Sequence, residues 1–117
     1  MEIYNKLVRD NIDEIINNNG KGEKAIVRIL NNSEYKQELL KKLHEEFNEL
    51  LEAINSGIKD NIIEESSDLI EVIRAINNDN LEEILIKMKE KRNKKGGFAK
   101  RKYLEKVEKI NYTKNNN

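Results

Sequence analysis

Three long runs of helical periodicity, interrupted by no proline, constrain the fold of this chain more than any other feature. Apolar side chains recur three and four residues apart over about residues 33–54, 60–76 and 81–95. Glycine, serine and asparagine separate the runs and mark the turns between them. The pattern predicts an all-α, antiparallel helical bundle that occupies a single domain over residues 1–117.

The rest of the chain holds a shorter helix and two ambiguous segments. Helical spacing predicts a helix over residues 6–17, and Ser33 is the expected N-cap of the long helix that follows. Residues 24–30 suit a short strand or an extended arm, and residues 98–110 suit either a strand or a helix. The sequence leaves open whether these two segments pair as a minor two-stranded attachment to the bundle.

Composition excludes several classes of site. Lys plus Arg and Asp plus Glu number 22 each, so no net positive field favours nucleic acid or an anionic membrane. The absence of cysteine excludes a disulfide framework, a thiolate zinc site and a cysteine nucleophile. No apolar run approaches the roughly 20 residues that span a bilayer, and no apolar signal region begins the chain, so we expect a cytoplasmic protein.

Four carboxylates project toward the apolar faces of two predicted helices. At about 100° per residue, Glu46 lies at the rim of the apolar arc of the 33–54 helix, with Glu49 beyond it on the same side. Glu65 projects inside the arc of the 60–76 helix, and Asp68 lies just past its edge. An ionised carboxylate inside an apolar arc is destabilising by several kcal/mol unless a cation or hydrogen-bond donors compensate it.

Two interpretations of the inward Glu65 remain open from the pattern alone. The side chain can neutralise a buried Lys or Arg or lie at an oligomer interface, or it can bind a metal together with Glu46, Glu49 and Asp68. Four hard oxygen donors on two helices suit Mg²⁺, for which Mn²⁺ can substitute, and leave room for water and substrate phosphates.

The spacing of these acids resembles the signature of a known family. Glu46 to Glu49 reads E-x-x-E and Glu65 to Asp68 reads E-x-x-D, in the order found in the MazG-like all-α nucleoside triphosphate pyrophosphohydrolases. Ser66 and Ser67 depart from the usual apolar filler of the second motif. This departure affects packing rather than a ligand position.

Segments outside the acid motifs resemble one branch of that group. The opening Tyr4-Asn5-Lys6-Leu7-Val8-Arg9-Asp10 and the later Lys95-Gly96-Gly97-Phe98 and Tyr103-Leu104-Glu105 are similar to the house-cleaning, phosphoribosyl-ATP pyrophosphohydrolase-like branch. Asp13 stands where related openings commonly have proline, which leaves the substrate less certain than the chemistry.

The resemblance implies a reaction and a set of residue roles. Glu46, Glu49, Glu65 and Asp68 would bind Mg²⁺, and the substrate would be a nucleoside triphosphate or a related nucleotide such as phosphoribosyl-ATP. The products would be the monophosphate and pyrophosphate. Glu49 is the candidate general base that holds the attacking water.

Basic residues supply candidate contacts to phosphate. Four of them precede the Gly96-Gly97 turn, where the alternative is a solvated helix end that the helix dipole favours. Two more lie one helical turn apart near the start of the chain. The candidates are Lys91, Arg92, Lys94, Lys95, Lys6 and Arg9.

Two further expectations concern assembly and the rival functions. So short a bundle buries little apolar surface by itself, so we expect a homodimer or a higher homo-oligomer. The main rival is a non-enzymatic helical dimerisation or regulatory module, against which the inward Glu65 argues. Nucleic-acid binding through the basic end is disfavoured by the neutral net charge and the lack of a recognition helix.

Overall fold

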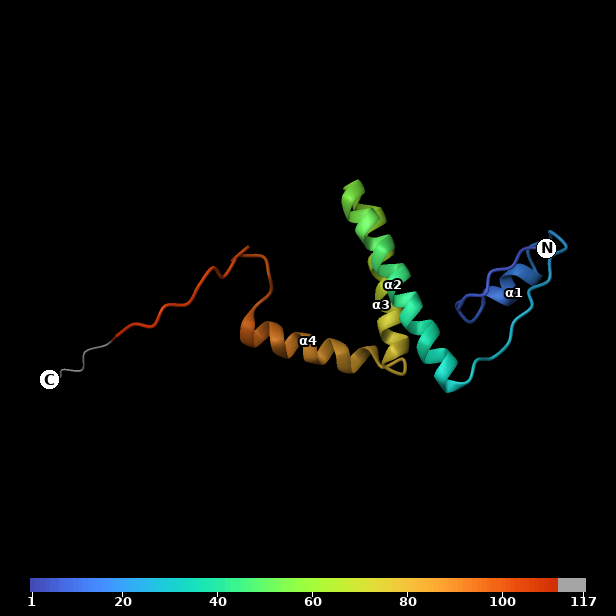
Figure 1. Cartoon of the computed structure of the whole chain (residues 1–117). Coiled ribbons are helices and arrows are strands. Elements are labelled where there is room, and N and C mark those ends of the chain that lie inside the picture. Colours follow the sequence, from blue (N-terminus) through green and yellow to red (C-terminus); the bar gives the residue numbers. More distant parts are fainter. Residues whose placement is uncertain (112–117) are drawn as a thin grey trace. The chain divides into compact units, whose positions relative to one another are not determined.

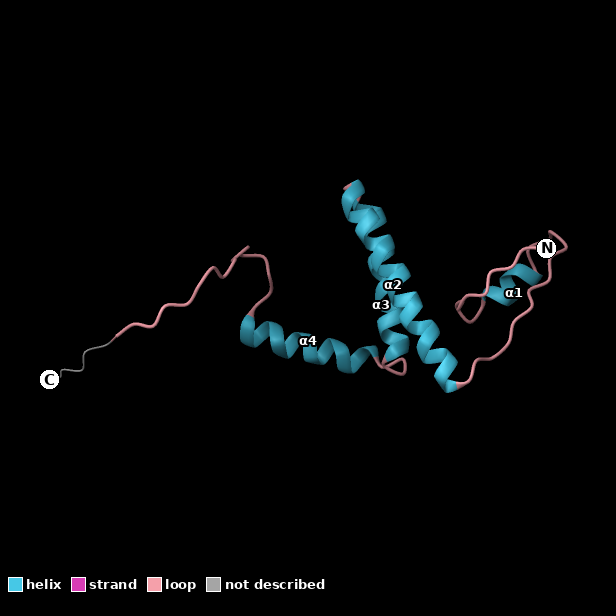
Figure 2. Cartoon of the chain, in the orientation of Figure 1, coloured by secondary structure: helices cyan, strands magenta, loops and turns pink. Residues whose placement is uncertain are grey.

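The computed structural model describes residues 1–111. The regular secondary structure in that range is entirely helical, which confirms the predicted fold class. The helices, labelled in Figure 1 and coloured as helix in Figure 2, share their order with the predicted runs. They are α1 (Ile12–Asn17), α2 (Asn32–Ser56), α3 (Lys59–Ile76) and α4 (Leu81–Lys95). None of the helices in this part of the chain is long and apolar enough to cross a membrane.

The chain divides into two compact units, each described by itself. The first runs from Met1 to Leu81 and contains α1, α2 and α3. The second begins at Glu82 and contains most of α4 and the segment that follows it. All the acidic residues of interest lie in the first unit.

A helical hairpin of α2 and α3 forms the centre of the first unit, where the two helices lie side by side (Figure 1). Gly57 takes a left-handed conformation with φ 71° and donates its N–H to the Ile54 carbonyl at 3.1 Å, which ends α2. A residue with no Cβ enters this conformation without strain. The short connection returns the chain as α3, so the two helices are antiparallel neighbours.

A subset of the shielded positions of this hairpin follows a heptad-like spacing. Those on α2 recur at intervals of four and three, and those on α3 at intervals of three and four, which is the period of two helices packed along a seam. The α2 positions are Leu39, Leu43, Glu46, Leu50 and Ala53. The α3 positions are Ile62, Glu65, Leu69 and Val72.

Asn31, rather than the predicted Ser33, caps the N-terminus of α2. The Asn31 side chain accepts a hydrogen bond from the Glu34 N–H at 2.9 Å, and the Glu34 carboxylate accepts one from the Asn31 N–H at 3.3 Å. This reciprocal capping box satisfies two backbone donors at once, which a cap at Ser33 does not achieve. Ser33 instead lies in the first turn of the helix.

Helix α1 is shorter than predicted and begins at Ile12, so residues 6–11 are not helical. Asn5 has a positive φ of 45°, and Arg9 starts a turn in which its carbonyl accepts from the Ile12 N–H at 3.1 Å. Asp10 and Asn11 favour turns because their side chains compete for backbone groups. The apolar spacing of Leu7 and Val8 therefore arises in an irregular segment, where both side chains are half-buried.

The two ambiguous segments form no strand within residues 1–111. Gly96, with φ 85°, ends α4 by donating its N–H to the Arg92 carbonyl at 2.8 Å, and the chain beyond it is irregular. A two-stranded ribbon has no sheet face to bury, so isolated pairing is marginal in water. The minor β attachment that the sequence left open is thus not formed in the described part of the chain.

A second apolar stripe on the hairpin is left exposed. On α2 it comprises Leu40, Phe47, Leu51 and Ile54, which are 43–52% exposed and lie on one face of the helix. On α3, Ile63 and Ile70 are 56% and 47% exposed. Among residues 1–111 the buried apolar side chains are Leu39, Ala53 and Val72, each of which keeps 6–8% of its exposure. The single chain therefore covers little of its own apolar surface.

Candidate metal centre

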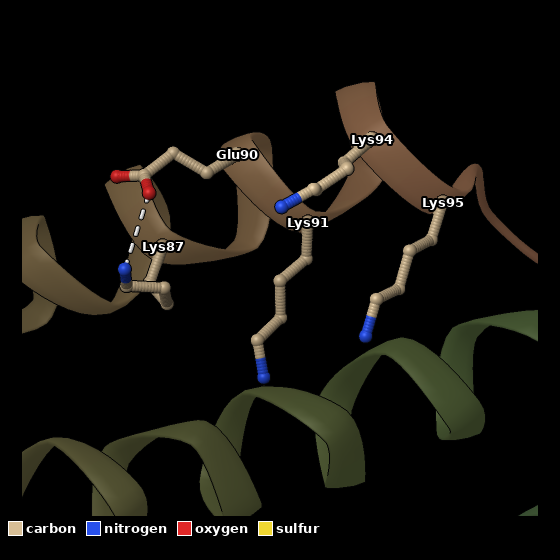
Figure 3. A pocket seen from close by; sticks show the side chains of 5 residues that line it. All are labelled: Lys87, Glu90, Lys91, Lys94 and Lys95. Carbon is tan, nitrogen blue, oxygen red and sulfur yellow. Dashed lines mark hydrogen bonds and ion pairs between the residues drawn. The ribbon is translucent and has the colours of Figure 1, made fainter.

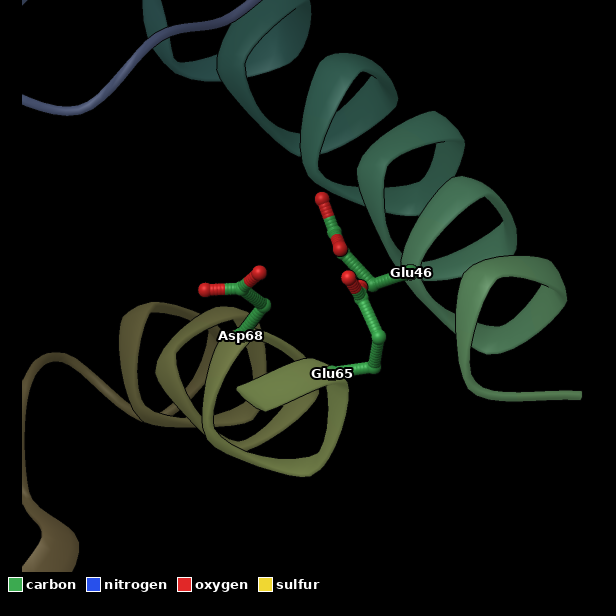
Figure 4. Close-up of side chains that lie close together, drawn as sticks. All are labelled: Glu46, Glu65 and Asp68. Atoms are coloured by element: carbon green, nitrogen blue, oxygen red, sulfur yellow. The ribbon is translucent and has the colours of Figure 1, made fainter. Parts of the chain in front are cut away.

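Three of the four predicted acids meet between the helices of the hairpin. Glu46 extends from α2, and Glu65 and Asp68 extend from α3, one turn apart. Each offers one carboxylate oxygen, and these oxygens all lie within 4.8 Å of one another (Figure 4). The cluster follows from the seam, because Glu46 and Glu65 occupy two of its positions and replace the apolar side chains expected there.

Glu46 is the most shielded of the three carboxylates. Its side chain is only 16% exposed, and Lys42, one turn earlier on α2, places its Nζ 4.0 Å from Oε1. Burial raises the pKa of Glu46 above its ordinary value, Lys42 opposes that rise, and the charges of Asp68 and Glu49 add to it. The ionised form of Glu46 is therefore destabilised in the folded chain.

Glu65 is half-buried, and its pKa is raised for the same reasons. Desolvation is the largest cause, followed by repulsion from Asp68, Glu49 and Glu46. No Lys or Arg of residues 1–111 forms an ion pair with its carboxylate. The described chain thus holds no buried cation that would support the interpretation of Glu65 as the partner of one.

Asp68 is held by an arginine from the start of the chain. The Arg9 guanidinium donates through Nη2 to Oδ1 of Asp68 at 2.7 Å, across 59 residues of sequence. The Arg9 side chain is 58% exposed and that of Asp68 is 35% exposed. This ion pair brings the non-helical segment before α1 to the acidic cluster.

Glu49, the fourth predicted acid, lies outside the set of close oxygens. It is exposed on α2, one turn beyond Glu46. Its charge nevertheless contributes to the raised pKa of both Glu46 and Glu65, so it lies near enough to interact with them. Glu49 is therefore a solvent-exposed neighbour of the cluster.

The donor set fits a hard divalent cation. All the converging ligand atoms are carboxylate oxygens, which Mg²⁺ and Mn²⁺ prefer, and the cluster is half-open to solvent. The negative charge is only partly compensated, because Arg9 pairs with Asp68 and Lys42 approaches Glu46, while Glu65 forms no ion pair with a cation of residues 1–111. A divalent cation would favour the ionised carboxylates against the desolvation and the mutual repulsion that raise the pKa of Glu46 and Glu65.

The remaining predicted phosphate ligands are Lys6 in the first unit and four residues of α4 in the second. Lys6 sits over the Tyr4 ring, with Nζ 5.5 Å from the ring centroid. On α4, an open pocket is lined by Lys87, Glu90, Lys91, Lys94 and Lys95, and Lys87 pairs with Glu90 at 3.1 Å (Figure 3). Arg92 approaches Gly97, where an added Cβ would lie 3.7 Å from the guanidinium.

Two charged neighbours of the cluster escaped the sequence analysis. Lys42 carries a readable signal, because it precedes Glu46 by four residues on one helix face. The contact of Arg9 with Asp68 carries none, since no local pattern relates residues 59 apart. Arg9 was predicted as a phosphate ligand, but not as the partner of an acid.

A comparison with protein-family models supports the resemblance seen in the sequence. Residues 23–72 match the model described as phosphoribosyl-ATP pyrophosphohydrolase, a hydrolase of phosphoanhydride bonds in the MazG-like all-α superfamily. The match contains all four predicted acids but neither the opening segment nor the basic end of α4. No curated protein and no solved structure matches the chain.

Proposed function

We propose that this chain is an Mg²⁺-dependent nucleotide pyrophosphohydrolase. The premise is that residues 23–72 are a phosphoribosyl-ATP pyrophosphohydrolase segment of the MazG-like superfamily. The observation that carries the proposal is the convergence of Glu46, Glu65 and Asp68 inside that segment. The substrate is a nucleoside triphosphate or a related nucleotide such as phosphoribosyl-ATP. Water adds its oxygen to phosphorus as the α–β phosphoanhydride bond breaks, which yields the monophosphate and pyrophosphate.

In this proposal Glu46, Glu65 and Asp68 hold the metal, and Glu49 completes the ligand set. A bound divalent cation supplies neutralisation of phosphate charge and lowers the pKa of a coordinated water. The antiparallel hairpin fixes the positions from which these side chains act, because each lies on a long helix packed against the other. Sites on rigid helices keep their geometry better than sites on loops.

Glu49 is our candidate for the general base. Its side chain is exposed to solvent, so an attacking water can reach it. A carboxylate there can accept the proton that water loses as the new P–O bond forms. The other three acids of the ligand set are half-buried and are less accessible to that water.

We further propose a house-cleaning role, in which the nucleotide carries a modified or unwanted base. The support is the likeness of residues 4–10 and 95–98 to that branch, and both segments lie outside the matched range of 23–72.

The test is a panel of canonical and modified nucleoside triphosphates, together with phosphoribosyl-ATP, assayed separately for pyrophosphate and orthophosphate. We expect at least one of them to release pyrophosphate with Mg²⁺ or Mn²⁺, and none to do so in excess chelator. Orthophosphate as the sole product, or turnover without metal, would contradict the proposed function. No turnover together with a stable oligomer would favour the dimerisation module.

The basic end of α4 is expected to bind substrate phosphates. Replacing Lys91, Arg92, Lys94 and Lys95 together by glutamine should raise KM by about tenfold or more, because several exposed charge contacts of modest strength are lost. Metal binding should change little, since the acids are retained. The matched control removes four exposed lysines elsewhere, Lys24, Lys36, Lys41 and Lys59. An equal KM in the two variants would show that the basic end of α4 is a solvated surface that does not bind phosphate.

A further inference from the structure

Arg9 occupies the position of a counter-ion at the acidic cluster. Its Nη2 lies 2.7 Å from Oδ1 of Asp68, and within residues 1–111 no other carboxylate forms an ion pair with it. Asp68 is also one of the three acids whose oxygens converge. The Asp68 carboxylate is thus both the partner of the Arg9 guanidinium and a member of the site that fits a divalent cation.

The backbone at Arg9 is anchored while its side chain is accessible. The Arg9 carbonyl accepts a hydrogen bond from Ile12 at 3.1 Å, and the preceding Leu7 and Val8 are half-buried. The side chain itself is 58% exposed. The guanidinium can therefore leave Asp68 by side-chain rotation, without unfolding the segment that carries it.

Electrostatics determines when the Arg9 side chain rotates away from Asp68 and toward which group. A divalent cation held by Asp68 repels a guanidinium bonded to the same carboxylate, so the two compete in the absence of substrate. The nucleotide then brings several negative charges next to the metal. Arginine matches phosphate with a planar fork that can form two charge-assisted hydrogen bonds.

We propose that Arg9 is an exchangeable counter-ion of the cluster: it neutralises Asp68 in the metal-free protein and transfers to the substrate phosphates when metal and nucleotide bind. The inference rests on the proposed function. In this inference Arg9 binds phosphate when the nucleotide is present and pairs with Asp68, a proposed metal ligand, when it is absent. The N-terminal segment is then part of the binding site, although it lies outside residues 23–72.

The test compares Arg9→Gln with a matched control, Arg28→Gln. Arg28 forms a similar exposed pair with Glu34, at 2.8 Å and away from the cluster. Affinity for Mn²⁺ alone is measured from the electron paramagnetic resonance of the free ion, and affinity for a non-hydrolysable triphosphate is measured at saturating Mn²⁺. Circular dichroism verifies that each variant keeps its helical content.

The proposal requires two effects of opposite sign. Arg9→Gln should bind Mn²⁺ alone up to about tenfold more tightly, because one positive charge next to the cation is removed. It should bind the triphosphate about ten- to a hundredfold more weakly, because a charge-assisted contact to phosphate is lost. Arg28→Gln should leave both affinities within about twofold of wild type, as expected for a surface pair.

The outcomes separate this inference from the proposed function. If the wild type binds Mn²⁺ and Arg9→Gln binds it no more tightly, Arg9 does not compete with the metal and the inference fails alone. If Mn²⁺ binding tightens but triphosphate binding is unchanged, Arg9 does not transfer to phosphate and the inference also fails. A wild-type protein that binds no Mn²⁺ and releases no pyrophosphate would overturn both.

Discussion

Replacing Glu65 by glutamine is expected to abolish pyrophosphate release, by at least about a thousandfold, while the helical fold is retained. Glu65 lies in the α2–α3 seam, has a raised pKa and has no cationic partner in the described chain. Its charge is therefore unfavourable to the metal-free fold. We expect the melting temperature without metal to stay the same or to rise, and the stabilisation by Mg²⁺ to disappear.

Melting curves of the wild type and the variant, each with and without Mg²⁺, measure these effects. The matched control is Glu64→Gln, which removes a neighbouring exposed carboxylate on the same helix and should keep both turnover and Mg²⁺ stabilisation. The competing account has Glu65 neutralise a buried cation, and then the variant should lose about 3 to 5 kcal/mol of stability. Such a loss of stability, with no effect of Mg²⁺ on the melting temperature of the wild type, would contradict the proposed metal site.

Replacing Phe47 by aspartate is expected to dissociate the protein into poorly folded single chains. We infer a homo-oligomer because the stripe of Leu40, Phe47, Leu51 and Ile54 is about half exposed on a helix whose other face already packs on α3. Full burial of each such side chain contributes about 1.5 to 3 kcal/mol, and a two-fold interface buries every one of them twice. A charge at Phe47 would be desolvated in both copies.

Sedimentation measures the outcome, and circular dichroism reports the helical content. Asn48→Asp is the matched control, because it adds the same charge at the adjacent exposed position, which lies off the stripe. We expect the wild type and this control to sediment as the same oligomer at micromolar concentration. A wild type that sediments as a stable, helical monomer would contradict the inference from the exposed stripe.

Helical periodicity carried most of the fold prediction. The runs that became α3 and α4 were predicted at, or within one residue of, their ends, because asparagine and glycine stop them clearly. The start of α2 was wrong because Ser33 and Asn31 are both good caps, and the choice depends on whether Glu34 can return the hydrogen bond. The predicted start of α1 was wrong because Leu7 and Val8 fit a helical spacing but lie in an irregular segment.

The candidate site was predictable to the extent that it follows the seam. Glu46 and Glu65 interrupt two regular apolar series, so a projection of each helix suffices to find them. How near Glu49 and Asp68 come to those two depends on how the helices are rotated in the hairpin, which one sequence does not determine. The pairing of Arg9 with Asp68 depends on the path of a non-helical segment, for which no periodicity exists.

The central claim is that the carboxylates of α2 and α3 hold a divalent cation next to the nucleotide phosphates. Anomalous diffraction from crystals grown with Mn²⁺ and a non-hydrolysable triphosphate tests it most directly, because the signal locates the metal itself. The account predicts an anomalous peak bonded to oxygens of Glu46, Glu65 and Asp68, at about the 2.0 to 2.2 Å typical of such ligands. Bound triphosphate with no peak among these three residues, or with Mn²⁺ held elsewhere on the chain, would contradict it.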